Sequence, residues 1–253
     1  HLSIRRQRQM CIRDRFKVVE SKKEDIDVEK YAKSLTLESV AKWGATVAIE
    51  KTDDAFMVEL QNKVLKDFYA FLKTGTLKGT QKKWQKALAI AKGAVLNKFA
   101  GMNRNVTEVV GFANVMDFYD WLGDKEITVQ TMFGLQYIKD FFGFSTLFLL
   151  PDAYIPAKTV IATPVENIDL YYIDPGDSDF KKLGLDYTTS GETNLIGFHA
   201  GGNYTNATGE TYAIMGMKLW AEYLDGVCVV TVGNTETIPG VSSPVSGASS
   251  NGK

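Results

Sequence analysis

One long segment of the sequence, TDDAFMVELQNKVLKDFYAFLKTG at residues 52–75, has the periodicity of a single amphipathic helix. Its apolar residues recur at spacings of three and four, which places them on one face of a helix. They are Phe56, Leu60, Val64, Phe68 and either Phe71 or Leu72. Thr52 is the expected N-cap, because the two aspartates after it suit the positive end of the helix dipole. With Gly75 as the C′ residue, a helix over residues 52–74 has about six turns, which is long for an ordinary small domain.

The rest of the chain mixes helical and strand patterns. A glycine-punctuated link, GTLKGT, leads to a second amphipathic helix with a basic outer face over residues 81–99. Asn114 is the expected N-cap of a short helix that ends at Gly123. We expect a further helix over residues 133–143 and strands over residues 107–114, 144–150, 158–164 and 168–174. Residues 194–232 are typical of three strands, the middle one over 212–224, with Asp225-Gly226 as a hairpin turn. These patterns predict an α+β fold without internal repeats.

The first fifteen residues, HLSIRRQRQMCIRDR, differ from the rest of the chain. A transit peptide would be Ser-rich and amphipathic, and a secretory signal would hold an apolar stretch of about 7–15 residues. A natural basic arm that binds phosphate is an alternative interpretation. The codons CAG ATG TGT ATA AGA GAC AGA encode QMCIRDR and contain a string that looks like the transposase mosaic end of sequencing libraries. We therefore expect residues 1–15 to be an adaptor artefact and the protein itself to begin near Phe16, in mid-gene.

The charge changes once residues 1–15 are set aside. The remainder carries 24 basic and 29 acidic residues, a net charge of −5, which argues against a nucleic-acid-binding surface. Cys228 and His199 are then the only cysteine and histidine, so neither an internal disulfide nor a Cys/His zinc cluster can form. No apolar run reaches the ~18 residues of a membrane span. The composition indicates a globular protein of a reducing compartment.

His199, in GFHAGG, is the first candidate for chemistry. A catalytic histidine needs a nucleophile or an orienting partner, and the sequence shows neither a nearby cysteine nor a nucleophile elbow. We expect a histidine in a strand or turn that makes a structural hydrogen bond. The adjacent GGNYTNATGE lacks the strand–GxGxxG–helix context of a dinucleotide site and the lysine of a phosphate loop, so it predicts a turn.

Other clusters also favour structural roles. Asp174, Asp177 and Asp179 could collect a calcium ion, but the spacing and the closing glutamate of an EF-hand are absent. A solvated Asp-Pro-Gly turn is the better interpretation. Cys228 lies in the apolar VCVVTV and is expected to be a buried small hydrophobe. Three lysines could contact phosphate but fit a solvated helix face better; they are Lys82, Lys83 and Lys86.

These observations together identify no site of chemistry. Sequons at Asn105, Asn203 and Asn206 have meaning only in a secreted protein. The sequence therefore predicts no catalytic, cofactor-binding or metal-binding residues, and no cofactor. A long helix and several β elements without a catalytic constellation favour a structural or binding protein over an enzyme.

Four motifs occur in a recognisable order between residues 31 and 232. They are KDFYAFLKTGT, VVGFANVMDFYDWLGDKEITVQTMFGLQYIKDFFG, KTVIATPVENIDLYYIDP and GETYAIMGMKLWAEYLDGVCVVTV. This order resembles the major capsid (major head) proteins of tailed phages, particularly those of Gram-positive hosts, which have the HK97 fold. The resemblance implies that the first motif ends the spine helix and that the middle motifs form the axial domain at the centre of each capsomer. The last motif resembles the peripheral-domain strands that return beside the spine helix.

The resemblance also implies a division of the chain. Residues 16–30 would be a remnant of the return strand of the E-loop, and the N-terminal arm and outgoing E-loop strand would be missing from a truncated subunit. The peripheral domain would comprise residues 31–78, with the spine helix over 52–74, and the strands of residues 193–232. Residues 79–192 would form the axial domain. The Gly/Ser/Pro-rich residues 233–253 are expected to be a disordered tail.

A capsid subunit acts by self-association rather than by catalysis. The resemblance implies a structural subunit of an icosahedral phage head, assembled into pentamers and hexamers that enclose double-stranded DNA without sequence-specific binding. The implied partners are further copies of the chain, with scaffold, portal and maturation protease, and no membrane. The implied location is the virion, after assembly in the bacterial host cytoplasm. Without the arm and the complete E-loop, which reach onto neighbouring subunits, we expect monomers or disordered aggregates rather than regular shells.

Two other functions remain open. Encapsulin nanocompartments resemble the same fold but package enzymes. An uncharacterised α+β enzyme that uses His199 with an aspartate or glutamate belongs to a different class. The resemblance locates no crosslinking residues.

Overall fold

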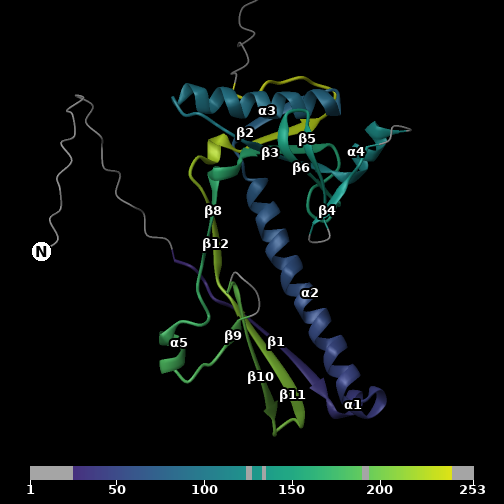
Figure 1. The fold of residues 1–253 in the computed structure, drawn as a ribbon, viewed down its shortest axis with the longest axis vertical. Helices are drawn as coiled ribbons and strands as arrows, with labels where there is room; N and C mark the ends of the chain where they lie inside the picture. Colours follow the sequence, from purple (N-terminus) through teal and green to yellow (C-terminus); the bar gives the residue numbers. More distant parts are fainter. Residues whose placement is uncertain (1–24, 124–126, 133–134, 190–193, 241–253) are drawn as a thin grey trace, which may run out of the picture.

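The described part of the chain consists of two bodies joined by one long helix (Figure 1). The computed structural model describes residues 25–123, 127–132, 135–189 and 194–240. The expected adaptor artefact and most of the expected E-loop remnant therefore lie outside the described residues. The mixture of helices with three sheets confirms the α+β prediction.

The long helix, α2 (Ala45–Leu72), has 28 residues and begins earlier than predicted. Gly44, with φ 82° and ψ 149°, is its N-cap, and the same glycine ends the short helix α1 (Leu37–Trp43). Thr52 is therefore an interior residue of α2. The left-handed backbone at Gly44, which glycine adopts at little cost, lets two helices follow each other at an angle.

The predicted apolar face of α2 is largely confirmed. Phe56, Leu60 and Leu72 are buried, but Tyr69 is the fully buried aromatic where we expected Phe68. Gly75 does not have the positive φ of a C′ residue. A Cβ at Gly75 would lie 2.5 Å from the backbone carbonyl oxygen of Val227, so the position requires glycine for space.

The upper body in Figure 1 is built on a seven-stranded sheet. Its order is β2 (Leu77–Gln81), β13 (Cys228–Val232), β7 (Thr159–Pro164), β3 (Val109–Asn114), β6 (Phe144–Leu150), β5 (Leu135–Phe141) and β4 (Gln130–Met132). Helix α3 (Trp84–Gly101) packs on one face, and the C-terminal end of α2 packs on the other. The predicted link over residues 75–80 is therefore wrong, because β2 pairs in parallel with β13.

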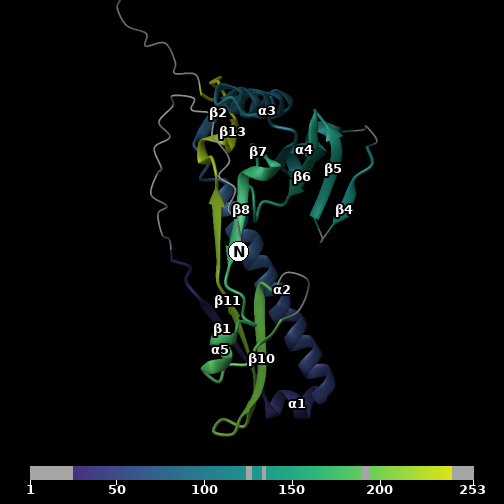
Figure 2. The same cartoon turned by 60° about the vertical axis from the view of Figure 1, so that its left-hand side comes forward.

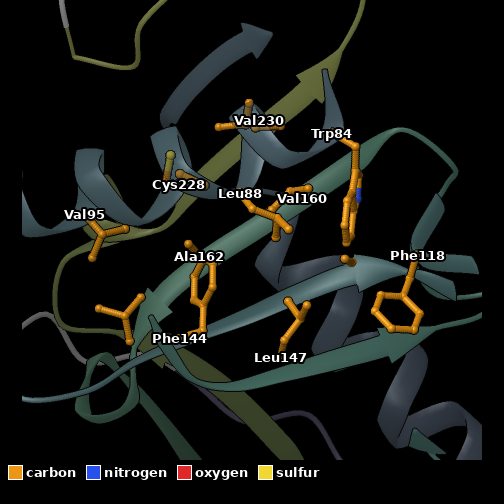
Figure 3. Close-up of a cluster of buried hydrophobic side chains, with 14 of the residues drawn as sticks. Trp84, Leu88, Val95, Phe118, Phe144, Leu147, Val160, Ala162, Cys228 and Val230 are labelled. Atoms are coloured by element: carbon orange, nitrogen blue, oxygen red, sulfur yellow. The ribbon is translucent and has the colours of Figure 1, made fainter. Parts of the chain in front are cut away.

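The two faces of this sheet are separated by the alternation of side chains along each strand. Val160 and Ala162 of β7 join the cluster under α3, whereas Ile161 between them joins the cluster under α2. Cys228 and Val230 of β13 likewise face α3 (Figure 3). Both faces are apolar because both are covered, which explains the continuous apolar pattern of these strands.

The lower body holds a four-stranded sheet. Its order is β1 (Glu29–Thr36), β11 (Thr208–Met215), β10 (Ile196–Asn203) and β9 (Thr188–Thr189). The N-terminal half of α2 covers one face, where Phe56 and Leu60 pack against Ala213. The loop that contains α5 (Ser178–Lys182) lies on the other side (Figure 2).

A two-stranded ribbon of β8 (Ile168–Tyr172) and β12 (Met217–Ala221) connects the two bodies beside α2. The short 3₁₀ helix η1 (Val165–Asn167) precedes β8. No helix in the described part of the chain is both long enough and apolar enough to cross a membrane.

The helix predicted over residues 133–143 is wrong. Residues 135–141 form β5, which pairs antiparallel with β6, and Tyr137 faces Phe148 across the ladder. Asp140, Phe142 and Gly143 have φ of 53°, 50° and 77°, so the turn between the strands uses left-handed backbone. The apolar residues of this segment have the spacing of a helix, but aromatic packing between β5 and β6 stabilises the hairpin.

The hairpin predicted at Asp225-Gly226 is also wrong. Residues Leu224–Gly226 form a 3₁₀ helix, η2, and the strands on either side of it belong to different sheets. The predicted middle strand over residues 212–224 is likewise divided between β11 and β12. The actual hairpin joins β10 to β11, where Asn203 pairs with Thr208. This confirms GGNYTNATGE as a turn.

The two bodies divide the chain differently from the expected domain ranges. Strand β9 and helix α5 lie with the lower body although residues 79–192 were expected in the axial domain. Strand β13 lies in the upper sheet although residues 193–232 were expected in the peripheral domain. Residues 233–240 pack against β2, so the expectation of disorder is wrong for them, and residues 241–253 lie outside the described part.

Candidate assembly surfaces

His199 lies on the exposed outer face of the four-stranded sheet. Its Nδ1 is 3.0 Å from the backbone carbonyl oxygen of Asp186, and its ring makes an edge-to-face contact with Tyr187 at 6.4 Å. The predicted structural hydrogen bond is confirmed, and the partner is a backbone group rather than a nucleophile. The histidine holds the 174–187 loop on the sheet.

We expect His199→Ala to lower the free energy of unfolding by no more than about 1 kcal/mol, because one exposed hydrogen bond is lost. Chemical denaturation measures this change. A loss of several kcal/mol would show that His199 has a larger structural role than this geometry supports.

The three aspartates of DPGDSD have local partners. A carboxylate oxygen of Asp174 accepts from the amide of Gly176 at 2.8 Å, and Asp177 caps α5 by accepting from the amide of Asp179. Asp179 forms an ion pair with Lys182 at 2.7 Å. The predicted Asp-Pro-Gly turn is confirmed. Among the described residues, no group of three or more His, Cys, Asp and Glu side chains is arranged to hold a metal ion.

Cys228 is fully buried under α3, as predicted. Burial raises the pKa of its thiol to about 12, because the thiolate would lose its solvation. A thiol with this pKa carries almost no thiolate at neutral pH and is a poor nucleophile.

We expect Cys228 to resist alkylation by iodoacetamide at pH 8 in the native protein and to react fully in denaturant. Mass spectrometry of intact protein reads this out, with a free peptide thiol as the control. Rapid native labelling at pH 8 would contradict the buried position.

Lys86 is more than part of a solvated helix face. Its ammonium group pairs with Glu236 at 2.9 Å, which links α3 to the residues after β13. Lys86 is exposed, so the prediction of a solvated helix face is confirmed, and the structure adds a partner that is far away in the sequence.

The hollow between α2 and the β5–β6 hairpin has a volume of about 520 Å³. Its lining is Gln61, Asn62, Leu65, Val115, Leu135, Gln136, Leu149, Pro151 and Tyr154. These side chains include no carboxylate, histidine, cysteine or lysine that could transfer a proton or attack a substrate at neutral pH. The hollow is suited to contact rather than to acid–base chemistry.

Two exposed apolar surfaces are the features that sequence reasoning missed. The corner surface, where α1 meets α2, consists of Leu37, Trp43, Val47 and Ile49, and Trp43 is 58% exposed. The ribbon surface consists of exposed apolar side chains on both faces of the β8–β12 pair, with Leu170 and Tyr172 on one face and Tyr171 and Trp220 on the other. Aromatic side chains are enriched at protein–protein contact surfaces. An alternation analysis of β8 could have found the second surface, since its three consecutive apolar residues cannot all face one covered side.

The two surfaces lie on different elements of an elongated subunit. A chain with distinct surfaces can bind its neighbour head to tail, and such heterologous contacts form rings when the rotation between neighbours closes and open filaments when it does not. Both surfaces are accessible to a neighbouring protein.

Comparisons with known proteins show similarity at the level of fold. No protein-family model matches the sequence, and no curated protein matches it. The structure is similar to a chain from Mycobacterium phage Che8, with a TM-score of 0.52 and 9% identity over 81% of this chain and 70% of that chain. It is also similar to the holo-SrpI encapsulin complex from Synechococcus elongatus PCC 7942, with a TM-score of 0.50 and 9% identity over 81% of this chain and 73% of that chain.

The architecture is thus that of the shell-forming capsid and encapsulin proteins. In particular, the chain has the HK97-like fold. The resemblance and the fold predicted from the sequence are both confirmed.

Proposed function

We propose that this chain is a structural subunit of an icosahedral phage head that self-assembles into pentamers and hexamers around double-stranded DNA. The HK97-like fold is the observation that carries this proposal. The corner and ribbon surfaces support it, because both leave apolar side chains exposed that a neighbouring copy can cover. The subunit is structural rather than catalytic, and its location is the virion after assembly in the host cytoplasm.

The proposal assigns the upper body to the axial domain at the centre of the capsomer and the lower body to the peripheral domain. Further copies of the chain are the main partners, with scaffold, portal and maturation protease beside them. The net charge of −5 over residues 16–253 suits a container that encloses DNA without holding it tightly.

Sedimentation velocity over a range of protein concentrations tests self-association directly. We expect any association of the chain to be irregular and to increase with concentration, and we expect a double variant of the ribbon surface, Tyr171→Ser with Trp220→Ser, to associate less. Val58→Ser is the matched control, since Val58 is 54% exposed on the middle of α2. Equal effects of the ribbon variant and the control would contradict the proposal, as would the absence of shells of regular size from preparations of both the chain and the complete gene product in negative-stain microscopy.

An encapsulin-type nanocompartment is the second candidate, because the holo-SrpI encapsulin complex has a similar fold. Gene neighbours separate the two functions. Terminase, portal and protease genes support a phage head, whereas a peroxidase or ferritin-like gene supports a nanocompartment.

A further inference from the structure

The edge of β2 is occupied by residues that follow β13 in the sequence. Strand β2 is at the end of the seven-stranded sheet and pairs with β13 along its inner side. On its outer side, the amide of Thr80 donates to the carbonyl oxygen of Thr237 at 3.2 Å, and the amide of Thr237 donates to the carbonyl oxygen of Thr80 at 2.8 Å. This is the hydrogen-bonded pair of an antiparallel ladder, although it involves only one residue of each segment.

Residues 233–240, which we call the strap, follow the outer edge of β2. The amide of Gly233 donates to the carbonyl oxygen of Gln81 at 2.8 Å, so the chain turns around the end of β2. The amide group of the Gln81 side chain donates to the carbonyl oxygen of Thr237 at 2.9 Å. Pro239 is buried beside β2.

Gly79 makes this contact possible. A Cβ at Gly79 would lie 2.5 Å from Cγ of Pro239 and 3.0 Å from the carbonyl oxygen of Thr237. Gly79 does not have a positive φ, so the backbone alone does not demand glycine. The absence of a side chain at Gly79 therefore leaves the space that Pro239 and Thr237 of the strap occupy.

The charge around the edge is complementary to the strap. Four lysines lie on β2 and at the start of α3, namely Lys78, Lys82, Lys83 and Lys86, and the strap contributes one acid, Glu236. The hydrogen bond from Lys86 lowers the pKa of Glu236, and the field of Lys82 adds to this effect. The edge thus has an excess of positive charge for an extended acidic segment.

We propose that the strap covers the lysine-flanked edge of β2 within the same chain, and that an edge left uncovered pairs with a second copy of the chain. An exposed strand edge is a template for pairing with another chain, which proteins prevent by covering it. A peptide that adds to a sheet edge gains main-chain hydrogen bonds in the same way. The strap contacts the sheet through the Thr80–Thr237 pair, the hydrogen bonds of Gln81, one buried proline and one ion pair, and all of these lie outside the ladder of β2 with β13. The strap can therefore open without unfolding of the sheet. This inference does not depend on the proposed phage-head function.

The test uses Gly79→Val in the full chain, which expels the strap by steric overlap. Gly209→Val is the matched control, because Gly209 is also in a strand and a Cβ added there would have no atom within 4 Å. Hydrogen exchange should show a loss of protection at Thr80 of about tenfold or more in Gly79→Val and no change in the control. Sedimentation velocity should show new self-association of Gly79→Val at concentrations where the control does not change.

The peptide GNTETIPG, added in excess, should reverse the self-association of Thr237→Pro, because this variant keeps Gly79 and with it the space for Pro239 and for the carbonyl oxygen of Thr237. A peptide with Glu236→Lys and Thr237→Pro, which lacks both the acid and the paired amide, should have no effect. Thr237→Pro in the chain keeps Gly79 and repeats the experiment if circular dichroism shows that Gly79→Val is unfolded. Unchanged exchange at Thr80 in the strap variants, or equal effects of the two peptides, would overturn the proposal. Because the ribbon variant is not involved, failure here leaves the phage-head proposal unaffected.

Discussion

Leu72→Ala is expected to lower the free energy of unfolding by about 3 kcal/mol, a large part of the stability of a typical domain. Leu72 is the last residue of α2 and is 0% exposed. It belongs to the buried cluster that joins α2 to the upper sheet, together with Phe112 and Ile161. Truncation removes apolar contacts and leaves a cavity, because strands that are paired on both sides cannot move in to fill it.

Val58→Ala on the same helix is the control for helix propensity. Val58 is 54% exposed, and alanine is the better helix former, so we expect little change or a slight gain in stability. Urea denaturation monitored by circular dichroism measures both variants. A loss at Leu72 that is no larger than the change at Val58 would contradict the assignment of Leu72 to the junction between the two bodies.

Asn114→Ala is expected to cost about 3 kcal/mol, because one buried side chain makes three hydrogen bonds. The side-chain oxygen of Asn114 accepts from the amide of Met116 at 2.8 Å and caps α4 (Val115–Leu122). Its amide group donates to the carbonyl oxygen of Ile155 at 2.8 Å and to a carboxylate oxygen of Asp152 at 2.6 Å. Alanine would leave the buried carbonyl oxygen of Ile155 without this partner.

Asp177→Ala is the matched control, because Asp177 caps α5 at an exposed position. Loss of a solvated N-cap costs about 1 kcal/mol or less on a helix of this length, since water replaces the lost bond. The difference between the two variants therefore measures the effect of burial. Equal losses in urea denaturation would show that the contacts of Asn114 beyond its cap contribute nothing.

Local patterns in the sequence were sufficient to predict several structural features. Asn114 was predicted as an N-cap from its residue type and its position before an apolar helical pattern, and the structure confirms it. The apolar run at 158–164 predicted a buried strand, which is β7. The buried thiol of Cys228 followed from its apolar neighbours. In each case the deciding interactions lie within a few residues of the chain.

The predictions were wrong where contacts between residues far apart in the sequence determine the local structure. Residues 135–141 have helical spacing, but pairing with β6 makes them a strand. The Gly/Ser/Pro-rich composition after Val232 suggested disorder, yet Thr237 pairs with Thr80 because β2 presents an open edge. The ion pair of Lys86 with Glu236 could not be predicted, because its two residues meet only when β13 lies beside β2.

By itself, the sequence determined the class of fold, the long helix with its apolar face, and the resemblance to HK97-like capsid proteins. These depend on periodicity, capping and motif order, which are properties of neighbouring residues along the chain. Only the tertiary structure decided which strands pair, where the chain passes between the two bodies, and which apolar side chains remain exposed. The physical reason is that strand pairing and burial depend on contacts between segments far apart in the sequence, so the same residue can be core or contact surface according to what covers it.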